Sequence, residues 1–91
     1  MHKALDKVNL MKKNHKVEVY SAVWCPWCTK TKDFLKANGV AFMEKDVDAD
    51  PKYAEELVDK SGQRGIPVTV IDGKTVIVGF NVAELRKTLG L

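Results

Sequence analysis

The first half of the chain alternates between the apolar spacing of strands and that of helices. Residues 17–23 are rich in β-branched side chains and partly alternate in polarity, which predicts a strand. Pro26 suits the first turn of a helix, where its missing N–H is not needed, and Asn38-Gly39 ends that helix. A second strand is predicted over residues 40–47. The helix between them has a predicted buried face of Cys28, Thr31, Phe34 and Leu35.

The second half predicts a helix, a hairpin and a closing helix. Asp50-Pro51 is an N-cap followed by a first-turn proline, and Ser61-Gly62 ends this helix. Residues 67–71 and 74–78 flank Asp72-Gly73, the pair that a two-residue type I′ turn prefers. Asn81 with Glu84 three positions later is a variant of the capping box. The inward positions of the two helices are predicted to be Ala54, Leu57, Val58, Val82, Leu85 and Leu89.

The order β-α-β-α-β-β-α predicts one α/β domain built on a four-stranded mixed sheet flanked by helices. A length of 91 residues leaves room for a single domain, and 45% hydrophobic residues suffice for a core. No apolar run approaches the roughly 18–20 residues of a membrane span. The first residues also lack the apolar centre of a signal peptide, so we expect a cytoplasmic protein without a membrane partner.

The net charge of +3 belongs to the N-terminus. Residues 1–16 contain five lysines and one aspartate, whereas residues 17–91 contain ten basic and eleven acidic side chains. We therefore divide the chain into a basic tail over residues 1–15, either a short helix or disordered, and a domain over residues 16–91. Because the domain itself is nearly neutral, the charge does not indicate a nucleic-acid partner.

The candidate chemistry lies in Trp24-Cys25-Pro26-Trp27-Cys28, where a strand passes into a helix. A cysteine is nucleophilic only as the thiolate, and the N-terminus of a helix favours an anion. This predicts Cys25 as the attacking thiolate. Cys28 lies nearly one turn further along and is predicted to resolve a mixed disulfide formed at Cys25. Pro26 and Trp27 shape the loop and shield Cys28 from solvent.

Two other interpretations of the cysteine pair are weaker. A zinc site normally requires four ligands, but both histidines lie near the N-terminus and no second C-x-x-C exists. We therefore expect no metal. An inert buried pair does not account for the position of the motif at the start of a helix.

The element order and this motif together resemble the glutaredoxin family of the thioredoxin-like fold, over residues 16–91. Val19-Tyr20-Ser21 and the C-P-W-C sequence are similar to the family's first strand and dithiol site. Gly65-Ile66-Pro67 resembles its characteristic turn, which implies that Pro67 is cis and faces the cysteines. The resemblance also implies that the backbone of Ile66 pairs with an extended substrate.

Gly79-Phe80 stands where glutathione-using members usually carry Gly-Gly, and no acidic residue follows within three positions. Gln63 and Arg64 remain as candidate partners for a glutathione carboxylate. These departures resemble the NrdH-type redoxins, which implies reduction by thioredoxin reductase and ribonucleotide reductase as an electron acceptor. Trp24 or Trp27 is expected to offer an apolar docking patch beside the dithiol.

The sequence therefore predicts a small, monomeric dithiol–disulfide oxidoreductase acting on disulfide-containing proteins or small disulfides. It needs no organic cofactor, because the electrons travel through the sulfurs of Cys25 and Cys28. One alternative is a glutathione-dependent glutaredoxin. An alternative of another class is an iron–sulfur cluster carrier that uses Cys25 from two subunits together with external thiols.

Overall fold

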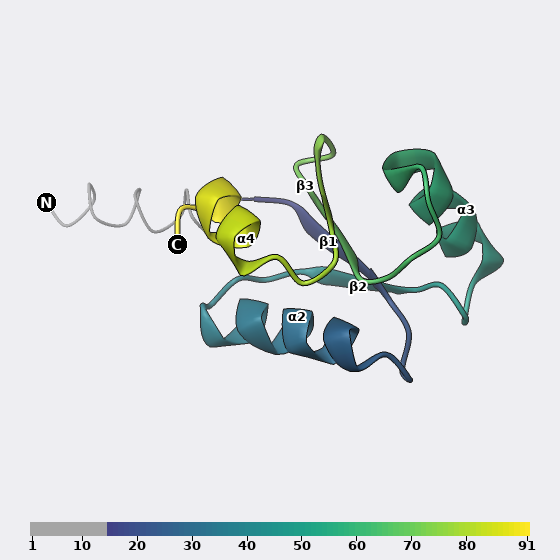
Figure 1. Cartoon of the computed structure of the whole chain (residues 1–91), viewed down its shortest axis with the longest axis horizontal. Coiled ribbons are helices and arrows are strands. Elements are labelled where there is room, and N and C mark those ends of the chain that lie inside the picture. Colours follow the sequence, from purple (N-terminus) through teal and green to yellow (C-terminus); the bar gives the residue numbers. More distant parts are fainter. Residues whose placement is uncertain (1–14) are drawn as a thin grey trace, which may run out of the picture.

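Four short strands form one mixed sheet in the computed structural model, which describes residues 15–91 (Figure 1). The strands lie in the order β2-β1-β3-β4. The pair β1–β2 is parallel, whereas β3 runs antiparallel to both β1 and β4. This is the predicted four-stranded mixed sheet. The strand bounds are β1 Val17–Ser21, β2 Met43–Asp46, β3 Val68–Ile71 and β4 Thr75–Val78.

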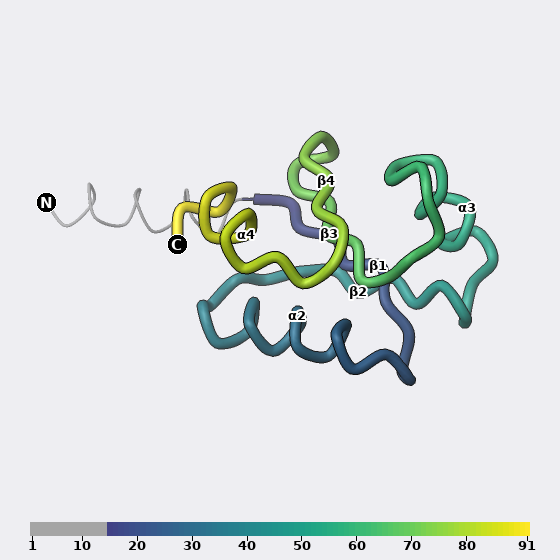
Figure 2. Tube along the Cα trace, in the orientation of Figure 1, coloured from purple at the N-terminus to yellow at the C-terminus, as the bar shows by residue number. Residues whose placement is uncertain are grey.

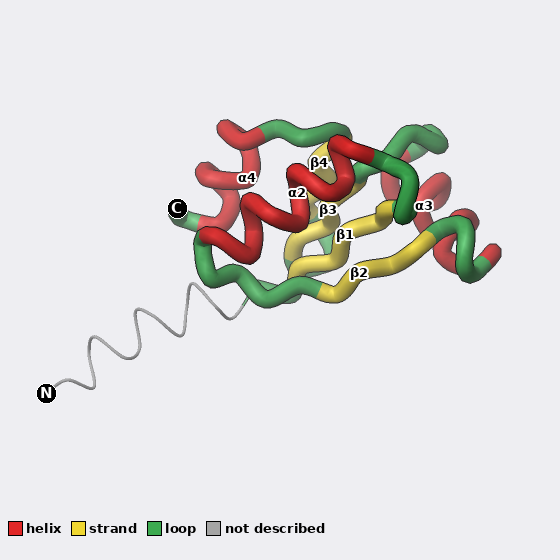
Figure 3. The backbone as a smooth tube through the Cα atoms, turned by 90° about the horizontal axis from the view of Figure 1, so that it is seen from below, coloured by secondary structure: helices red, strands yellow, loops and turns green. Residues whose placement is uncertain are grey.

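Three helices cover the two faces of this sheet: α2 Pro26–Ala37, α3 Pro51–Ser61 and α4 Val82–Leu89. Figure 3, viewed from the side of α2, shows that helix lying across the strands. Helices α2 and α4 close the larger core, and α3 closes the smaller core on the opposite face. The larger core contains Val17, Val19, Leu35, Val40, Ile71, Ile77, Leu85 and Leu89. The smaller one contains Tyr20, Leu57, Val68 and Val70.

The first two strands are shorter than predicted. β1 ends at Ser21 because the chain turns there, and the N–H of Cys25 donates to the carbonyl of Ala22 (3.2 Å). Val23 therefore leaves the sheet and is exposed. β2 starts only at Met43, because residues 38–40 are still held by the last turn of α2.

Most of the predicted helix ends and inward positions are confirmed. Asp50 caps α3 by accepting from the N–H of Lys52, and Asn81 caps α4 by accepting from the N–H of Glu84. The prediction for Val58 is wrong, since 39% of this residue is exposed. Leu57 is the residue of α3 that is buried against the sheet, and Val58 lies at the edge of this contact.

The hairpin turn forms at Asp72-Gly73, and the tip is the green loop at the top of Figure 2. Both residues have positive φ, 56° and 72°, as a type I′ turn requires. However, Ile71 pairs with Thr75, so Lys74 is an extra residue in the connection and the predicted two-residue loop is one residue too short. Register is set by the buried side chains of β3, not by the turn pair alone.

The predicted tail covers residues 1–15, of which residues 1–14 lie outside the described residues. His15, which we assigned to the tail, contacts the domain. Its Nδ1 lies 2.7 Å from Oδ2 of Asp72 in the hairpin turn. The start of the domain is thus tied to the β3–β4 turn.

Replacing Thr69 with valine is expected to stabilise the protein by about 1 kcal/mol. The Oγ1 of Thr69 is fully buried in β3 and has no hydrogen-bond partner among the described residues. Valine has nearly the same shape, favours strands and removes this unsatisfied polar group. Urea unfolding of the parent, Thr69→Val and Thr69→Ala would test this. A valine variant that is as destabilised as the alanine variant would show that the hydroxyl is satisfied.

Candidate active site

Cys25 is itself the N-cap of α2. Its Sγ accepts a hydrogen bond from the N–H of Cys28 (3.2 Å). The sulfur therefore lies at the positive end of the helix and satisfies one of the N–H groups that the first turn leaves without an intrahelical partner. Pro26 occupies the first helical position and needs no partner there. The backbone thus confirms that Cys25 lies at the start of the helix, as predicted.

Cys28 is completely buried and forms no disulfide with Cys25. Burial raises the pKa of the Cys28 thiol well above its ordinary value, and the hydrogen bond with Cys25 raises it further. Cys28 therefore stays protonated at neutral pH in this state. Cys25 is also buried, with 5% of the residue exposed, so the two cysteines differ mainly in position: Cys25 is the N-cap of α2, and Cys28 lies within its first turn.

Trp27 connects the start of α2 to the loop between β4 and α4. Its ring packs against Phe80, with the centroids 6.2 Å apart, and Phe80 in turn packs edge-on against Phe34. Just before Phe80, the N–H of Gly79 donates to the carbonyl of Pro67 (2.8 Å). Gly79 has φ +83°, a conformation that favours glycine. These contacts place the dithiol helix, Phe80 and Pro67 in one cluster.

Pro67 is cis, as the resemblance to the glutaredoxin family implies, and is buried at the entry to β3. The loop before it is held by Gln63, whose side-chain amide donates to the carbonyl of Gly65 (3.0 Å) and to Oγ of Ser61 (3.1 Å). The Oε1 of Gln63 also accepts from the N–H of Gly65. A Cβ at Gly65 would lie 2.7 Å from this oxygen. The polar atoms of Gln63 thus organise the loop that presents Ile66.

Trp24 lies on the other side of Cys25 and is tethered to the loop after β2. Its Nε1 donates to Oδ2 of Asp48, although 66% of the residue remains exposed. Asp48 is held in turn, because its N–H donates to Oδ1 of Asp46 (2.9 Å). The sequence had no signal for this contact, which joins residues 24 positions apart.

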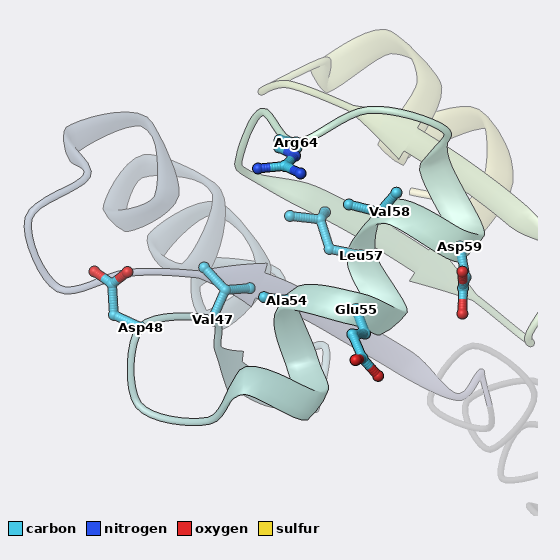
Figure 4. Close-up of a pocket in the computed structure, with 8 residues that line it drawn as sticks. All are labelled: Val47, Asp48, Ala54, Glu55, Leu57, Val58, Asp59 and Arg64. Carbon is cyan, nitrogen blue, oxygen red and sulfur yellow. The ribbon is translucent and has the colours of Figure 1, made fainter.

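Asp48 and Arg64 border a cavity of about 510 Å³ between the β2–α3 loop and α3. In Figure 4 Asp48 and Val47 lie on the loop at the left, Leu57 and Val58 on the helix at the centre, and Arg64 on the loop above them. Arg64 is exposed and forms no ion pair with a described residue. Arg64 thus lines this cavity and Trp24 contacts its residue Asp48, whereas Trp27, Gly79, Phe80 and Pro67 form a separate cluster.

The part of the chain over residues 15–91 contains no group of three His, Cys, Asp or Glu side chains arranged to hold a metal ion. Within the same residues, no helix has the length and apolar character needed to cross a membrane.

Comparisons with known proteins agree with this arrangement. The family model described as Glutaredoxin matches residues 17–76. A glutaredoxin-like 8.6 kDa protein in the rubredoxin operon of Clostridium pasteurianum is 45% identical over 73 residues, which covers 80% of this chain and 96% of that protein. The glutaredoxin structure from Methanosarcina mazei is 34% identical with a TM-score of 0.76, covering 84% of this chain and 79% of that one.

The NrdH-redoxin of Escherichia coli is a more distant structural relative. It is 28% identical with a TM-score of 0.71, and the match covers 79% of this chain and 92% of that one. It is described as a glutaredoxin-like protein with a thioredoxin-like activity profile. The region that the family model matches contains the dithiol, the cis-proline turn and most of the sheet. On these similarities and this fold, the chain belongs to the glutaredoxin family, whose members are in general thiol–disulfide oxidoreductases.

Proposed function

We propose that this protein reduces disulfides through Cys25 and Cys28. The observation that carries the proposal is the asymmetry of the pair: the Cys25 sulfur caps α2, and Cys28 is buried directly behind it as a thiol. A helix terminus favours the thiolate needed for attack, and a buried thiol three residues on is suited to the second step. No organic cofactor is needed, because the two sulfurs carry both electrons.

The reaction proceeds in two exchanges. The Cys25 thiolate attacks one sulfur of a substrate disulfide, so that a Cys25–substrate S–S bond forms and the first substrate thiolate leaves and takes up a proton. Cys28 then loses its proton and attacks Cys25, which forms the Cys25–Cys28 disulfide and releases the second substrate thiol. The substrate gains two electrons and two protons, and the protein becomes oxidised by the same amount.

The surface around Cys25 supports a polypeptide as substrate. Trp24 and Trp27 are 66% and 56% exposed, and Val23 is also exposed. Together they form an apolar surface on both sides of the nucleophile, of the kind that docks a protein partner. Ile66, ahead of the cis-proline, offers backbone groups to which an extended segment can pair as an added strand. We propose protein disulfides as the main acceptors, with that of ribonucleotide reductase among them, in line with the resemblance to NrdH-type redoxins.

Thioredoxin reductase is the electron donor that we propose. In support, the ring of Phe80 packs on Trp27 at the position where glutathione-using members carry glycine, and the amide of Gln63 is engaged within its own loop. Both features leave fewer groups for binding glutathione. The relative from E. coli with a thioredoxin-like activity profile points the same way.

The electron donor is tested by reducing the oxidised protein with NADPH in two separate systems. One contains thioredoxin reductase, and the other contains glutathione with glutathione reductase. We expect NADPH consumption with an added protein disulfide to be at least about tenfold faster in the first system, a difference in transition-state free energy of about 1.4 kcal/mol. Turnover in the second system alone would identify a glutathione-dependent glutaredoxin. Absence of turnover in both would argue against the redox function.

A further inference from the structure

The second exchange requires the thiolate form of Cys28, which the dithiol alone does not favour. Cys28 must lose its proton before it can attack Cys25, yet it is completely buried and its thiol is stabilised in the neutral form. A charged group that favours the Cys28 thiolate would have to lie inside the protein next to this sulfur.

Lys32 lies four residues after Cys28 on α2, so the two side chains share one face of the helix at neighbouring turns. Its side chain is folded toward the sheet and is only 16% exposed. The Nζ of Lys32 is 2.6 Å from Oε2 of Glu44 on β2. The same oxygen accepts from Oγ of the fully buried Ser21 at the end of β1 (3.0 Å). Glu44, which is itself held by Ser21, therefore anchors the ammonium group of Lys32 on the sheet side of α2, one turn beyond Cys28.

We propose that Lys32 is a positioning residue for the resolving step, and that its ammonium group, held by Glu44 and Ser21, stabilises the Cys28 thiolate as it attacks Cys25. This rests on the proposed function. The bonds that form and break are those of the second exchange described above. The proton of Cys28 passes through solvent to the departing substrate thiolate, and Lys32 keeps its own proton throughout.

The balance of charge around Cys28 agrees with this role. Burial and the hydrogen bond with Cys25 raise the pKa of Cys28, whereas a backbone hydrogen bond with Ala22 and, to a smaller extent, the positive charge of Lys32 lower it. The hydrogen bond from Lys32 lowers the pKa of Glu44, so this carboxylate stays ionised and keeps its hold on the ammonium group at neutral pH. The charged or titratable groups that act on Cys28 are Cys25 and Lys32, and Glu44 on the strand side is linked to Cys28 only through its ion pair with Lys32.

The test separates the two exchanges by reacting the reduced protein with 5,5′-dithiobis(2-nitrobenzoate) in a stopped-flow instrument. Attack by Cys25 releases one coloured thiolate at a rate that depends on reagent concentration, and attack by Cys28 releases a second at a rate that does not. We expect Lys32→Met to slow the second phase roughly tenfold at pH 7 and to shift its pH dependence upward, with the first phase unchanged. Lys32→Arg keeps the charge and most of the rate.

Lys36→Met is the matched control. Lys36 carries the same charge on α2, is exposed, and lies eight residues beyond Cys28, about 12 Å along the helix axis. It is expected to leave both phases unchanged. In Glu44→Gln the amide oxygen still accepts from Lys32, and the charge of Lys32 is no longer compensated, so the second phase should be at least as fast as in the parent.

A purely structural ion pair predicts a different pattern. Equal slowing by Lys32→Met and Glu44→Gln, or equal effects of Lys32→Met and Lys36→Met, would overturn the role of Lys32 while leaving the dithiol mechanism intact. If the parent releases no second equivalent of thiolate, the failure lies in the proposed function itself.

Discussion

Cys25→Ser is expected to abolish disulfide reduction, with a loss of at least about 10³-fold in kcat/KM. A serine hydroxyl at the N-cap of α2 can still accept from the N–H of Cys28, so the helix start is retained. It cannot ionise at neutral pH, however, and no nucleophile is left at the helix terminus. The measurement is the reduction of a small disulfide coupled to NADPH oxidation. Circular dichroism checks that the variant is folded.

Cys28→Ser should behave differently, because the first exchange remains possible and the second does not. A covalent adduct between Cys25 and the substrate should accumulate to about one equivalent, visible by mass spectrometry and released by dithiothreitol. An adduct in Cys25→Ser but not in Cys28→Ser would reverse the assigned roles. Equal loss of activity in both variants with no adduct in either would contradict the two-step mechanism.

Lys45→Met is expected to destabilise the fold by about 3 kcal/mol at pH 7. The ammonium group of Lys45 on β2 lies 2.9 Å from the carboxylates of Glu18 and Glu56, and its side chain is only 11% exposed. Removing it leaves the buried carboxylate of Glu18 without its close partner, since Lys16 is 4.0 Å away and exposed. The free energy of unfolding in urea measures the loss.

Two further variants separate the buried charge from general effects of the substitution. Lys52→Met changes an exposed lysine in α3 that forms no ion pair with a described residue, and it should alter the free energy of unfolding by less than about 0.5 kcal/mol. Adding Glu18→Gln to Lys45→Met should restore part of the lost stability. If the double variant is no more stable than Lys45→Met, the penalty is not due to the unpaired carboxylate.

The effect of Lys45 also depends on pH. The hydrogen bond from Lys45 lowers the pKa of Glu56 below its ordinary value of 4.5. The ion pair between Lys45 and Glu56 therefore stabilises the fold fully above pH 4.5, and this contribution is lost as the pH falls through the lowered pKa of Glu56. Burial opposes the charged form of Lys45, but the hydrogen bonds to Glu56 and Glu18 outweigh it and raise its pKa above 10.5. The difference between the parent and Lys45→Met should therefore shrink toward pH 3 and persist at pH 9.

Features set by neighbouring residues were predicted from the sequence because their physics is local. Asp50 and Asn81 cap their helices within three residues, Asp72-Gly73 adopts the positive φ values of its turn, and Cys25 takes the helix N-terminus ahead of Pro26. The element order follows from the same spacing of apolar residues. Each of these features depends on a few neighbouring residues in the chain and not on the residues that pack against them.

Contacts across the sheet were not predicted, because they depend on strand register. Tyr20 pairs with Lys45 and Val19 with Glu44 across β1 and β2. A shift of one residue would move both side chains of β2 to the opposite faces. The tether from Trp24 to Asp48 likewise depends on how the loops after β1 and β2 meet.

The sequence by itself determined the family, the order of the elements and the two sulfurs at the start of a helix. The tertiary structure decided which charges surround them. Glu44 and Lys45 are adjacent in the chain, yet the pleat of β2 directs Glu44 toward Lys32 of α2, and Lys45 toward Glu56 of α3. Side chains alternate between the two faces of a strand. Which helix a given side chain contacts is decided only when the strands have paired in register and the helices have packed on the two faces of the sheet.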